Sequence, residues 1–263
     1  REMDGRVVLR GKESRQQLLV TGHYATGQRR DLTRQVTYDV VPQGMIQVDS
    51  TGWVTPIGGG QVEIKVTHAT GVESSISVEV GDWDDIPQVN FANQIVPIFT
   101  KLMCNNGGCH GKSGGQNGFR LSLLGFEPLE DHEHLLMESQ GRRLSIALPE
   151  HSLLLLKATG RVPHGGGAPI EVGDHSYRLI RRWIAQGAPL GDANVARVAS
   201  IEVLPKNRVM PRNANQQLVV VAHYEDGTTE DVTAMAQYDP NVAEMAEISS
   251  TGRVKIMDQT GDV

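Results

Sequence analysis

Hydrophobic and polar positions follow two different periods along this chain of 263 residues. Near the start, Leu18, Val20 and Tyr24 fall on one side of an alternating pattern, the period of a β-strand with one buried face. The sequences "ATGQ" and "STG" adjoin such segments, and both are typical of turns. Several short strands at this spacing predict a β-sandwich.

The strand pattern occurs twice. Segment 17–40 returns as segment 217–240 in a constant register, which continues through "STGWV" and "STGRV". Self-similarity of this length without a gap indicates two copies of one domain. The second copy is incomplete, because nothing in the chain corresponds to residues 64–80. Missing strands leave sheet edges unpaired. We therefore expect either that the native protein continues or that this copy takes a strand from a partner by self-association.

The central part of the chain has a helical period instead. In segment 93–103, Ile98 and Phe99 lie on one face of a predicted helix. Segment 174–189 is a second amphipathic segment, with Asp174 as its predicted N-cap. Long glycine-rich loops separate the two, and little regular structure is predicted to hold them. We therefore expect a prosthetic group around which these loops fold.

Composition narrows the classes of function. The formal net charge of −6 argues against a nucleic-acid-binding surface. No apolar run approaches the roughly 20 residues of a membrane-spanning helix. The chain opens "REMDGR" without an initiator methionine, which is compatible with removal of an export signal.

The only two cysteines, Cys104 and Cys109, lie in the sequence "CNNGGCH", directly before His110. A disulfide would leave the histidine without a role. A zinc site would need further ligands from scattered histidines. A nucleophilic cysteine would need a base and an orienting group, and it would not explain the pair. Covalent haem uses all three residues: the thiols attach to the vinyl groups, and the histidine becomes the proximal iron ligand.

The order of these features carries a family resemblance. A helix, "CNNGGCH", long loops and a final helix with "YRLIRRWI" resemble a class I c-type cytochrome, although the usual spacing has two residues between the cysteines rather than four. The stretch "FTKLMCNNGGCHGKSGGQNGFRLSLLGFEP", followed by "SLLLLKATGRVPHGGG", is similar to the cytochrome c-like domain of planctomycete proteins. The repeated segment resembles the bacterial group-2 immunoglobulin-like domain.

These resemblances imply a multidomain fold class: two all-β immunoglobulin-like sandwiches flanking a mainly α class I cytochrome c-like domain. The implied boundaries are 1–81 for the first sandwich, 82–198 for the haem domain, and 199–263 for the incomplete second sandwich. In the family that the central domain resembles, such domains lie side by side within larger exported chains.

The resemblance also directs the search for a second axial ligand. Similar proteins often carry a methionine where this chain has Val162, and His164 is the obvious substitute. It follows Pro163 and precedes the glycine run 165–167, which lets the backbone approach a flat macrocycle.

Other candidates receive simpler interpretations. We expect core positions for Met103 and Met137. Among the other histidines, we expect solvated or exposed positions for His23, His223, His132, His134 and His175, and a cap or pocket position for His151.

The arginines fall into two groups. We expect haem propionate contacts for Arg142, Arg143 and Arg161, and a solvated face for Arg181 and Arg182.

The sequence thus predicts one-electron transfer by haem c, with His110 and His164 on the iron and redox proteins as partners. Covalent haem attachment implies an exported protein, in the periplasm or at the cell surface. The immunoglobulin-like domains would act as spacers or docking modules. Two other classes stay open: a haem sensor or peroxidase-like enzyme with an open sixth site, and a structural or adhesive protein with a disulfide.

Overall fold

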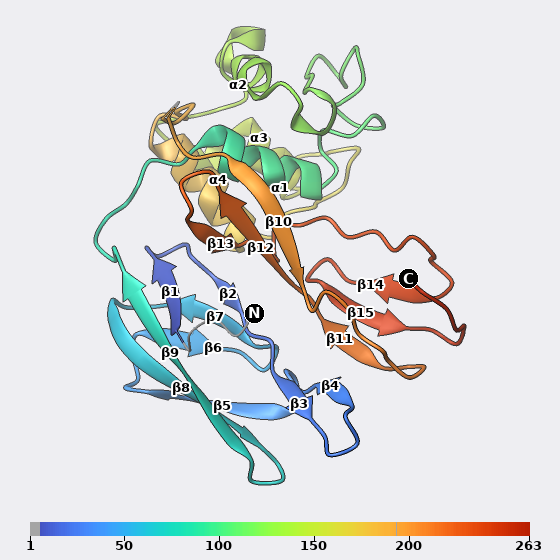
Figure 1. The fold of residues 1–263 in the computed structure, drawn as a ribbon. Helices are drawn as coiled ribbons and strands as arrows, with labels where there is room; N and C mark the ends of the chain where they lie inside the picture. Colours follow the sequence, from blue (N-terminus) through green and yellow to red (C-terminus); the bar gives the residue numbers. More distant parts are fainter. Residues whose placement is uncertain (1–5, 193) are drawn as a thin grey trace. The chain divides into compact units, whose positions relative to one another are not determined.

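The computed structural model describes residues 6–192 and 194–263. β-Sheets occupy both ends of the chain, and a small helical segment with four α-helices lies between them in sequence (Figure 1). The described residues divide into two compact units. One unit comprises residues 6–86 together with 198–263, and the other comprises residues 87–197. We call residues 6–86 the first repeat, 198–263 the second repeat and 87–197 the helical unit.

The first repeat is built from short strands and one long hairpin. Its described strands are β1 (Arg6–Arg10), β2 (Gln16–Gln17), β3 (Thr21–His23), β4 (Arg29–Asp31), β5 (Val36–Val41), β6 (Ile46–Val48), β7 (Trp53–Pro56), β8 (Gly60–His68) and β9 (Glu73–Gly81). They form a four-stranded sheet in the order β1-β9-β8-β5, a three-stranded sheet in the order β2-β7-β6, and the pair β3-β4. Strand β1 runs parallel to β9, and the other pairs are antiparallel.

The hairpin of β8 and β9 supplies much of the core of the first repeat. Alternate residues of β8, including Val62 and Ile64, are buried, as the period of a strand with one solvated face requires. They pack with Val78 of β9, with Leu18 and with Val54 of β7 in one hydrophobic cluster. Val54 and Ile64 are both fully buried.

The second repeat confirms the internal similarity. Its described strands are β10 (Val198–Leu204), β11 (Asn215–Gln217), β12 (Val219–Tyr224), β13 (Thr229–Asp231), β14 (Ala246–Ile248) and β15 (Arg253–Ile256). Strands β13, β14 and β15 begin and end at the positions that the repeat makes equivalent to the ends of β4, β6 and β7. The sheets have the orders β10-β12-β13 and β11-β15-β14, the latter corresponding to β2-β7-β6.

The repeats differ at residues 36–41 and at the equivalent residues of the second repeat. Residues 36–41 form β5, which pairs with β8 in the first repeat. The equivalent residues, 236–241, form no strand. The reason is local, because no described strand of the second repeat corresponds to β8. In the first repeat, the ladder hydrogen bonds of residues 36–41 are made with β8.

Reciprocal hydrogen bonds join the two repeats within their compact unit. The main-chain N–H of Gln217 donates to Oδ2 of Asp31 over 2.5 Å, and the N–H of Gln17 donates to Oδ2 of Asp231 over 2.6 Å. The two donors occupy equivalent positions of the repeats, and so do the two acceptors. Each repeat thus uses the same donor and the same acceptor position to bind the other. This is the pattern of an isologous two-fold interface.

The helical unit contains η1 (Phe91–Ile95), α1 (Val96–Lys101), η2 (Leu123–Gly125), α2 (Pro128–Leu136), η3 (Glu138–Gly141), η4 (Pro149–His151), α3 (Leu153–Ala158) and α4 (His175–Ala185). The helices predicted in segments 93–103 and 174–189 are confirmed as η1 with α1 and as α4. The Asp174 side chain caps α4 by accepting a 2.6 Å hydrogen bond from the N–H of Tyr177. No helix in the described part of the chain is long and apolar enough to cross a membrane.

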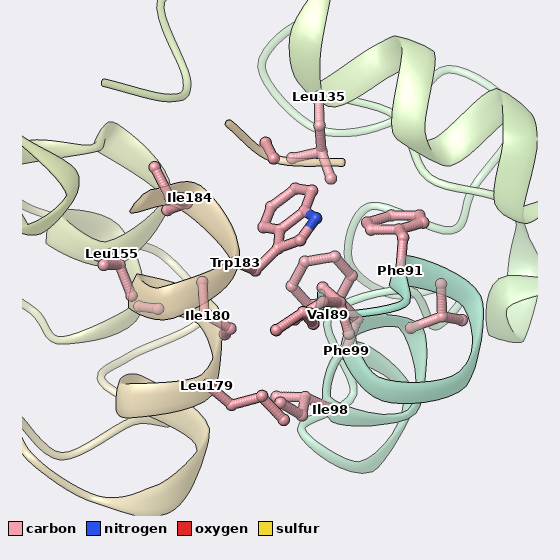
Figure 2. Close-up of a cluster of buried hydrophobic side chains, with 14 of the residues drawn as sticks. Val89, Phe91, Ile98, Phe99, Leu135, Leu155, Leu179, Ile180, Trp183 and Ile184 are labelled. Carbon is pink, nitrogen blue, oxygen red and sulfur yellow. The ribbon is translucent and has the colours of Figure 1, made fainter. Parts of the chain in front are cut away.

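Trp183 of α4 lies at the centre of the hydrophobic cluster in this unit. Figure 2 shows its indole between side chains of α4 and side chains that precede or belong to α1. The indole is fully buried, and its Nε1–H donates to the carbonyl oxygen of Pro189 over 2.8 Å. The buried ring therefore keeps its one polar atom satisfied. Phe91 packs against Trp183 with ring centroids 5.2 Å apart.

The predicted solvated face of α2 is wrong. His134 is buried, and its Nε2 lies 2.9 Å from Nη2 of Arg120. His132 is half-buried, and its Nε2 lies 2.8 Å from the carbonyl oxygen of Ala188. Beside them Asp131 is buried as well. Acidic composition misled the prediction, because the partners that bury these groups come from other segments of the chain.

The core positions predicted for two methionines are also wrong. The exposed fraction of Met137 is 76%, and that of Met103 is 44%. Met103 follows the last turn of α1 and has a φ of 61°, so it has left the helical path on which a core position was expected.

Candidate functional site

The cysteine loop starts directly after α1 and is organised by Asn106. The Asn106 side chain accepts hydrogen bonds from the N–H groups of Gly108 (3.0 Å) and Cys109 (2.9 Å). Its main-chain carbonyl accepts from the N–H of Gly111 over 2.9 Å. Asparagine side chains form such turns with the backbone two residues on. The four residues between the cysteines are therefore wound into a tight, hydrogen-bonded loop.

Two local features fix the start and end of this loop. Asn105 is buried, and its amide donates to the hydroxyl of Thr100 on α1 over 2.9 Å. At Gly111, a Cβ atom would stand 2.0 Å from the carbonyl oxygen of Asn105. The residue after His110 must therefore be glycine for the loop to close in this form.

Both thiols are free in the structure. Cys104 packs against the hydrophobic cluster of the helical unit, and burial, with a smaller contribution from Cys109, raises the pKa of its thiol to about 11. A buried thiol of this kind stays protonated at neutral pH. Since the thiolate is the reactive form of cysteine, this environment argues against a nucleophilic Cys104.

His110 is held at its backbone and at its ring. Its N–H donates to the carbonyl oxygen of Cys104 over 3.0 Å, and its own carbonyl accepts from the N–H of Leu121 over 2.9 Å. The ring Nδ1 lies 3.0 Å from the carbonyl oxygen of Phe119. Because a carbonyl only accepts, Nδ1 carries the proton and Nε2 is the free lone pair. Burial lowers the pKa of His110, which favours the neutral, ligating form of the imidazole.

His164 has the same arrangement on a different loop. Its Nδ1 lies 2.9 Å from the carbonyl oxygen of Gly167, so its Nε2 is likewise the free lone pair. The loop is tied to α3, where the Lys157 ammonium donates to the carbonyl oxygen of Pro163. A Cβ atom at Gly166 would stand 3.0 Å from Cε1 of His164. Glycine at this position lets the backbone pass against the imidazole.

The structure brings these two histidines together. The ring centroids of His110 and His164 are 6.3 Å apart, and the ring planes differ by only 7°. That separation is too long for direct contact between stacked rings. Imidazole–metal bonds are about 2 Å long, so two imidazoles on opposite sides of one ion have centroids about 6 Å apart. By this spacing, His110 and His164 are the residues that would hold a metal between them.

The three arginines assigned to propionates lie in different environments. Arg142 and Arg161 are exposed. Arg143 is buried, and its guanidinium donates to the main-chain carbonyls of His134, Glu138 and Gly118. It also lies over the Phe119 ring, 4.6 Å from the centroid. Arg143 therefore supports the segment that holds His110, rather than presenting a free guanidinium.

Apolar side chains next to the cysteine loop are partly exposed. The exposed fractions of Met103, Leu123 and Leu124 are 44%, 54% and 56%. Met103 precedes Cys104, and the N–H of Leu124 donates to the carbonyl oxygen of Asn105. An apolar group bound beside the loop would remove these side chains from water, which is favourable in proportion to the area covered.

The remaining histidines lie elsewhere. His151 is exposed and His175 is half-buried. His23 is exposed, as predicted, whereas His223 is half-buried and lies 3.4 Å from the Glu202 carboxylate. In residues 6–192 and 194–263, no three His, Cys, Asp or Glu side chains are grouped so that they could hold a metal ion. A closed structural zinc site needs four protein ligands, so the described part of the chain does not offer one.

Comparison of the chain with protein-family models found no match, and neither did comparison with curated proteins. Sequence reasoning missed the roles of Asn106 and of the Phe119 carbonyl. The Asn and Gly residues of "CNNGGCH" suit a longer loop, but nothing local indicates that the main-chain carbonyl of a later residue orients His110.

Proposed function

We propose that the helical unit binds haem c and transfers single electrons. Thioether bonds would join Cys104 and Cys109 to the porphyrin, and His110 and His164 would be the two axial ligands of its iron. The observation that carries the proposal is the pair of parallel imidazoles 6.3 Å apart, each with its Nδ1 against a main-chain carbonyl.

The residues fit such a group in three independent ways. The carbonyls of Phe119 and Gly167 orient the imidazoles and fix their tautomers, as metal-ligating histidines require. The partly exposed side chains of Met103 and Leu124 beside the loop suit a large apolar macrocycle. The protein supplies two imidazoles rather than a closed cage, which suits a metal whose other ligands come from a macrocycle.

The axial pair favours electron transfer over catalysis. A bound haem would supply a one-electron redox centre. Histidine at both axial positions would leave no open site for peroxide or a gas, and it gives a lower potential than a methionine ligand does. The role of His110 and His164 would be to hold the same coordination in both oxidation states.

The environment of the arginines changes one detail of the site. Arg143 is occupied by main-chain carbonyls, so we assign propionate pairing only to Arg142 and Arg161. Their exposed guanidiniums keep their donors available, and arginine pairs with carboxylates in a bidentate fashion.

The proposal extends to the place and partners of the protein. We propose that the two repeats are immunoglobulin-like domains of the bacterial group-2 type, that the helical unit is a cytochrome c-like domain of the planctomycete type, and that the whole chain acts outside the cytoplasm. Redox proteins would be its partners. The matched hydrogen bonds of the two repeats support a common domain type, and the family resemblance supports the location.

The decisive experiment is a visible spectrum of the full chain, oxidised and dithionite-reduced, after expression in a host that attaches haem c. Low-spin bands that remain with the polypeptide after acid–acetone extraction are the expected result. Colourless protein would overturn the haem proposal and favour a structural protein with a Cys104–Cys109 disulfide.

Variants assign the ligands separately. His164→Ala should convert the low-spin spectrum to a high-spin one, whereas His151→Ala, at an exposed histidine, should leave it unchanged. His110→Ala should prevent stable haem protein, and Cys109→Ala should leave at most one thioether. An unchanged spectrum in His164→Ala would remove His164 from the iron while leaving the haem in place.

A further inference from the structure

A cavity of about 420 Å³ lies within the unit formed by the two repeats. Both repeats contribute to its wall. Arg29, Arg30 and Arg34 come from the first repeat, and Arg208 and Arg253 come from the second. The volume falls within the range of sites for small molecules, roughly 300–1,000 Å³. This feature is separate from the haem proposal, because none of its lining residues belongs to the helical unit.

The charge of the lining contrasts with that of the chain. Five arginines face a single acidic residue, Asp31, in a protein whose formal net charge is −6. The Asp31 carboxylate is already engaged, since its Oδ1 accepts from the N–H of Thr33 over 2.8 Å and its Oδ2 accepts from Gln217. The cavity therefore concentrates positive charge that the wall itself does not neutralise.

The guanidiniums have neutral partners or none. Arg208 donates to the side-chain oxygens of Gln216 (3.0 Å) and Thr21 (3.4 Å), and Arg34 donates to that of Gln217 over 3.4 Å. Across the described ranges of the chain, Arg29 and Arg253 have no side-chain partner, and none of the five arginines forms an ion pair. A guanidinium carries five N–H donors, so most donors around the cavity remain available.

The pKa of Arg208 is affected by the other charges in the cavity wall. Burial lowers the pKa of this half-buried guanidinium, and the charge of Arg29 lowers it further, while the Asp31 carboxylate acts in the opposite direction. Like charges lining one cavity destabilise each other, whereas a bound anion would stabilise them. Arg–oxyanion contacts are frequently bidentate and are about twice as strong as neutral hydrogen bonds.

We propose that this cavity binds a small ligand that carries more than one phosphate or sulfate group. Guanidiniums are suited to the planar, bidentate recognition of such oxyanions. The volume exceeds what one inorganic ion needs, because a water molecule occupies only about 30 Å³ of liquid. Since both repeats supply arginines, the bound ligand would bridge them next to the reciprocal hydrogen bonds of Asp31 and Asp231.

The test measures the binding of two probes to the full chain by calorimetry. Inorganic pyrophosphate represents a free phosphate ligand, and a multiply sulfated disaccharide represents a sulfate ester on a glycan. We expect saturable binding of at least one probe, with an affinity that falls as salt rises. The tighter probe identifies the source of the oxyanion. Absence of saturable binding for both probes at low ionic strength would overturn the proposal.

Matched variants separate a site from general charge attraction. Arg208→Gln, Arg29→Gln and Arg253→Gln should each raise the dissociation constant about tenfold, the loss expected for one charge-assisted contact. Arg178→Gln, at an exposed position on α4, removes the same charge from the helical unit and should change it less than twofold. Arg253 has no side-chain partner in the described structure, so its removal should leave the melting temperature unchanged. Equal weakening by Arg178→Gln would also overturn the proposal.

Discussion

The two repeats share a hydrogen-bonding framework but not a hydrophobic core. In the first repeat, the hydroxyl of Thr33 accepts from the N–H of Val20 over 3.0 Å, and Thr233 accepts from Val220 over 2.8 Å in the second. The amide of Gln17 donates to the carbonyls of Leu18 and Thr51, and the amide of Gln217 donates to the equivalent carbonyls of the second repeat. The framework is thus reproduced contact by contact.

The cores differ because the strands differ. The first repeat buries ten hydrophobic residues in one cluster, half of them on β8 and β9. The second repeat has no described strands at the equivalent place, and Val219, Val220, Ala222 and Ala246 are its buried hydrophobic residues among those the structure describes. The hydrogen bonds of the framework are local, so they form in both repeats. A hydrophobic core requires two facing apolar surfaces, so it depends on strands such as β8 and β9.

The largest expected effect comes from the β8–β9 hairpin, which has no counterpart among the described strands of the second repeat. Ile64→Ala removes a fully buried side chain of β8 and should lower the free energy of unfolding by about 2–5 kcal/mol. Val41→Ala, at a residue with an exposed fraction of 63% on the neighbouring strand β5, should change it by about 0.5 kcal/mol or less. Chemical denaturation measures both, with amide exchange of β8 to assign the transition. Equal costs would mean that β8 does not hold the first repeat together.

A second test concerns the carboxylate through which the second repeat binds the first. Burial raises the pKa of Asp231 to about 6 from its ordinary value of 3.8, although the hydrogen bonds from Thr233 and Gln17 act in the opposite direction. Between pH 4 and pH 6, the folded state therefore keeps a proton that the unfolded chain has lost. Stability should fall as pH rises through this window, by on the order of 3 kcal/mol in total.

Asp231→Asn should abolish this dependence, whereas Asp239→Asn, at an exposed position of the same repeat, should retain it. Thermal unfolding at half-unit steps from pH 4 to pH 7 measures the slope. A slope that persists in Asp231→Asn would show that another group titrates and that its hydrogen bonds keep Asp231 charged.

A third test asks whether the shared turns are equally strained. Gly52 has a φ of 84° and Gly252 a φ of 76°, and a Cβ atom there would stand 2.7 Å from Thr33 and 2.8 Å from Tyr238, respectively. Gly52→Ala and Gly252→Ala should each cost roughly 2 kcal/mol or slightly more, because left-handed strain adds to the clash. Gly27→Ala, with a φ of 79° and open space around it, should cost only about 1 kcal/mol. If both glycines of the first repeat cost the same, the contact with Thr33 contributes nothing.

The parts of the fold that could be predicted from the sequence are those with local signals. The repeat and the helix containing Trp183 follow from self-similarity and from a regular apolar face. Helix α3 has no such signal, because "LLLLKA" is only six residues long and its four successive leucines favour no single face. The buried polar face of α2 depends on Arg120 and Ala188, which lie in other segments. A local stretch of sequence around α2 therefore could not predict that this face is buried.

The candidate site divides in the same way. Cys104, Cys109 and His110 form a motif, and His164 lies in a glycine-rich loop that the resemblance singled out. Their parallel ring planes depend on main-chain carbonyls that no sequence pattern specifies. Arg143 shows why the sequence does not specify such contacts. Its charge suits propionates, but in the structure its guanidinium donates to protein carbonyls, among them that of His134.

The smallest expected change in stability comes from a tyrosine hydroxyl that occupies equivalent positions in the two repeats. The hydroxyl of Tyr38 donates to the carbonyl oxygen of Thr33 over 2.7 Å, and that of Tyr238 donates to Thr233 over 2.9 Å. Tyr38→Phe and Tyr238→Phe each delete one hydrogen bond and should each cost about 1 kcal/mol, measured by chemical denaturation. Because burial raises the pKa of both phenols, each remains a protonated donor at any pH used.

Equal costs would mean that the framework contributes the same stability with or without a core beneath it. A cost confined to Tyr38 would mean that the hydrogen bond stabilises only where the β8–β9 hairpin keeps water away from it, and the core would then be the cause of the framework's strength.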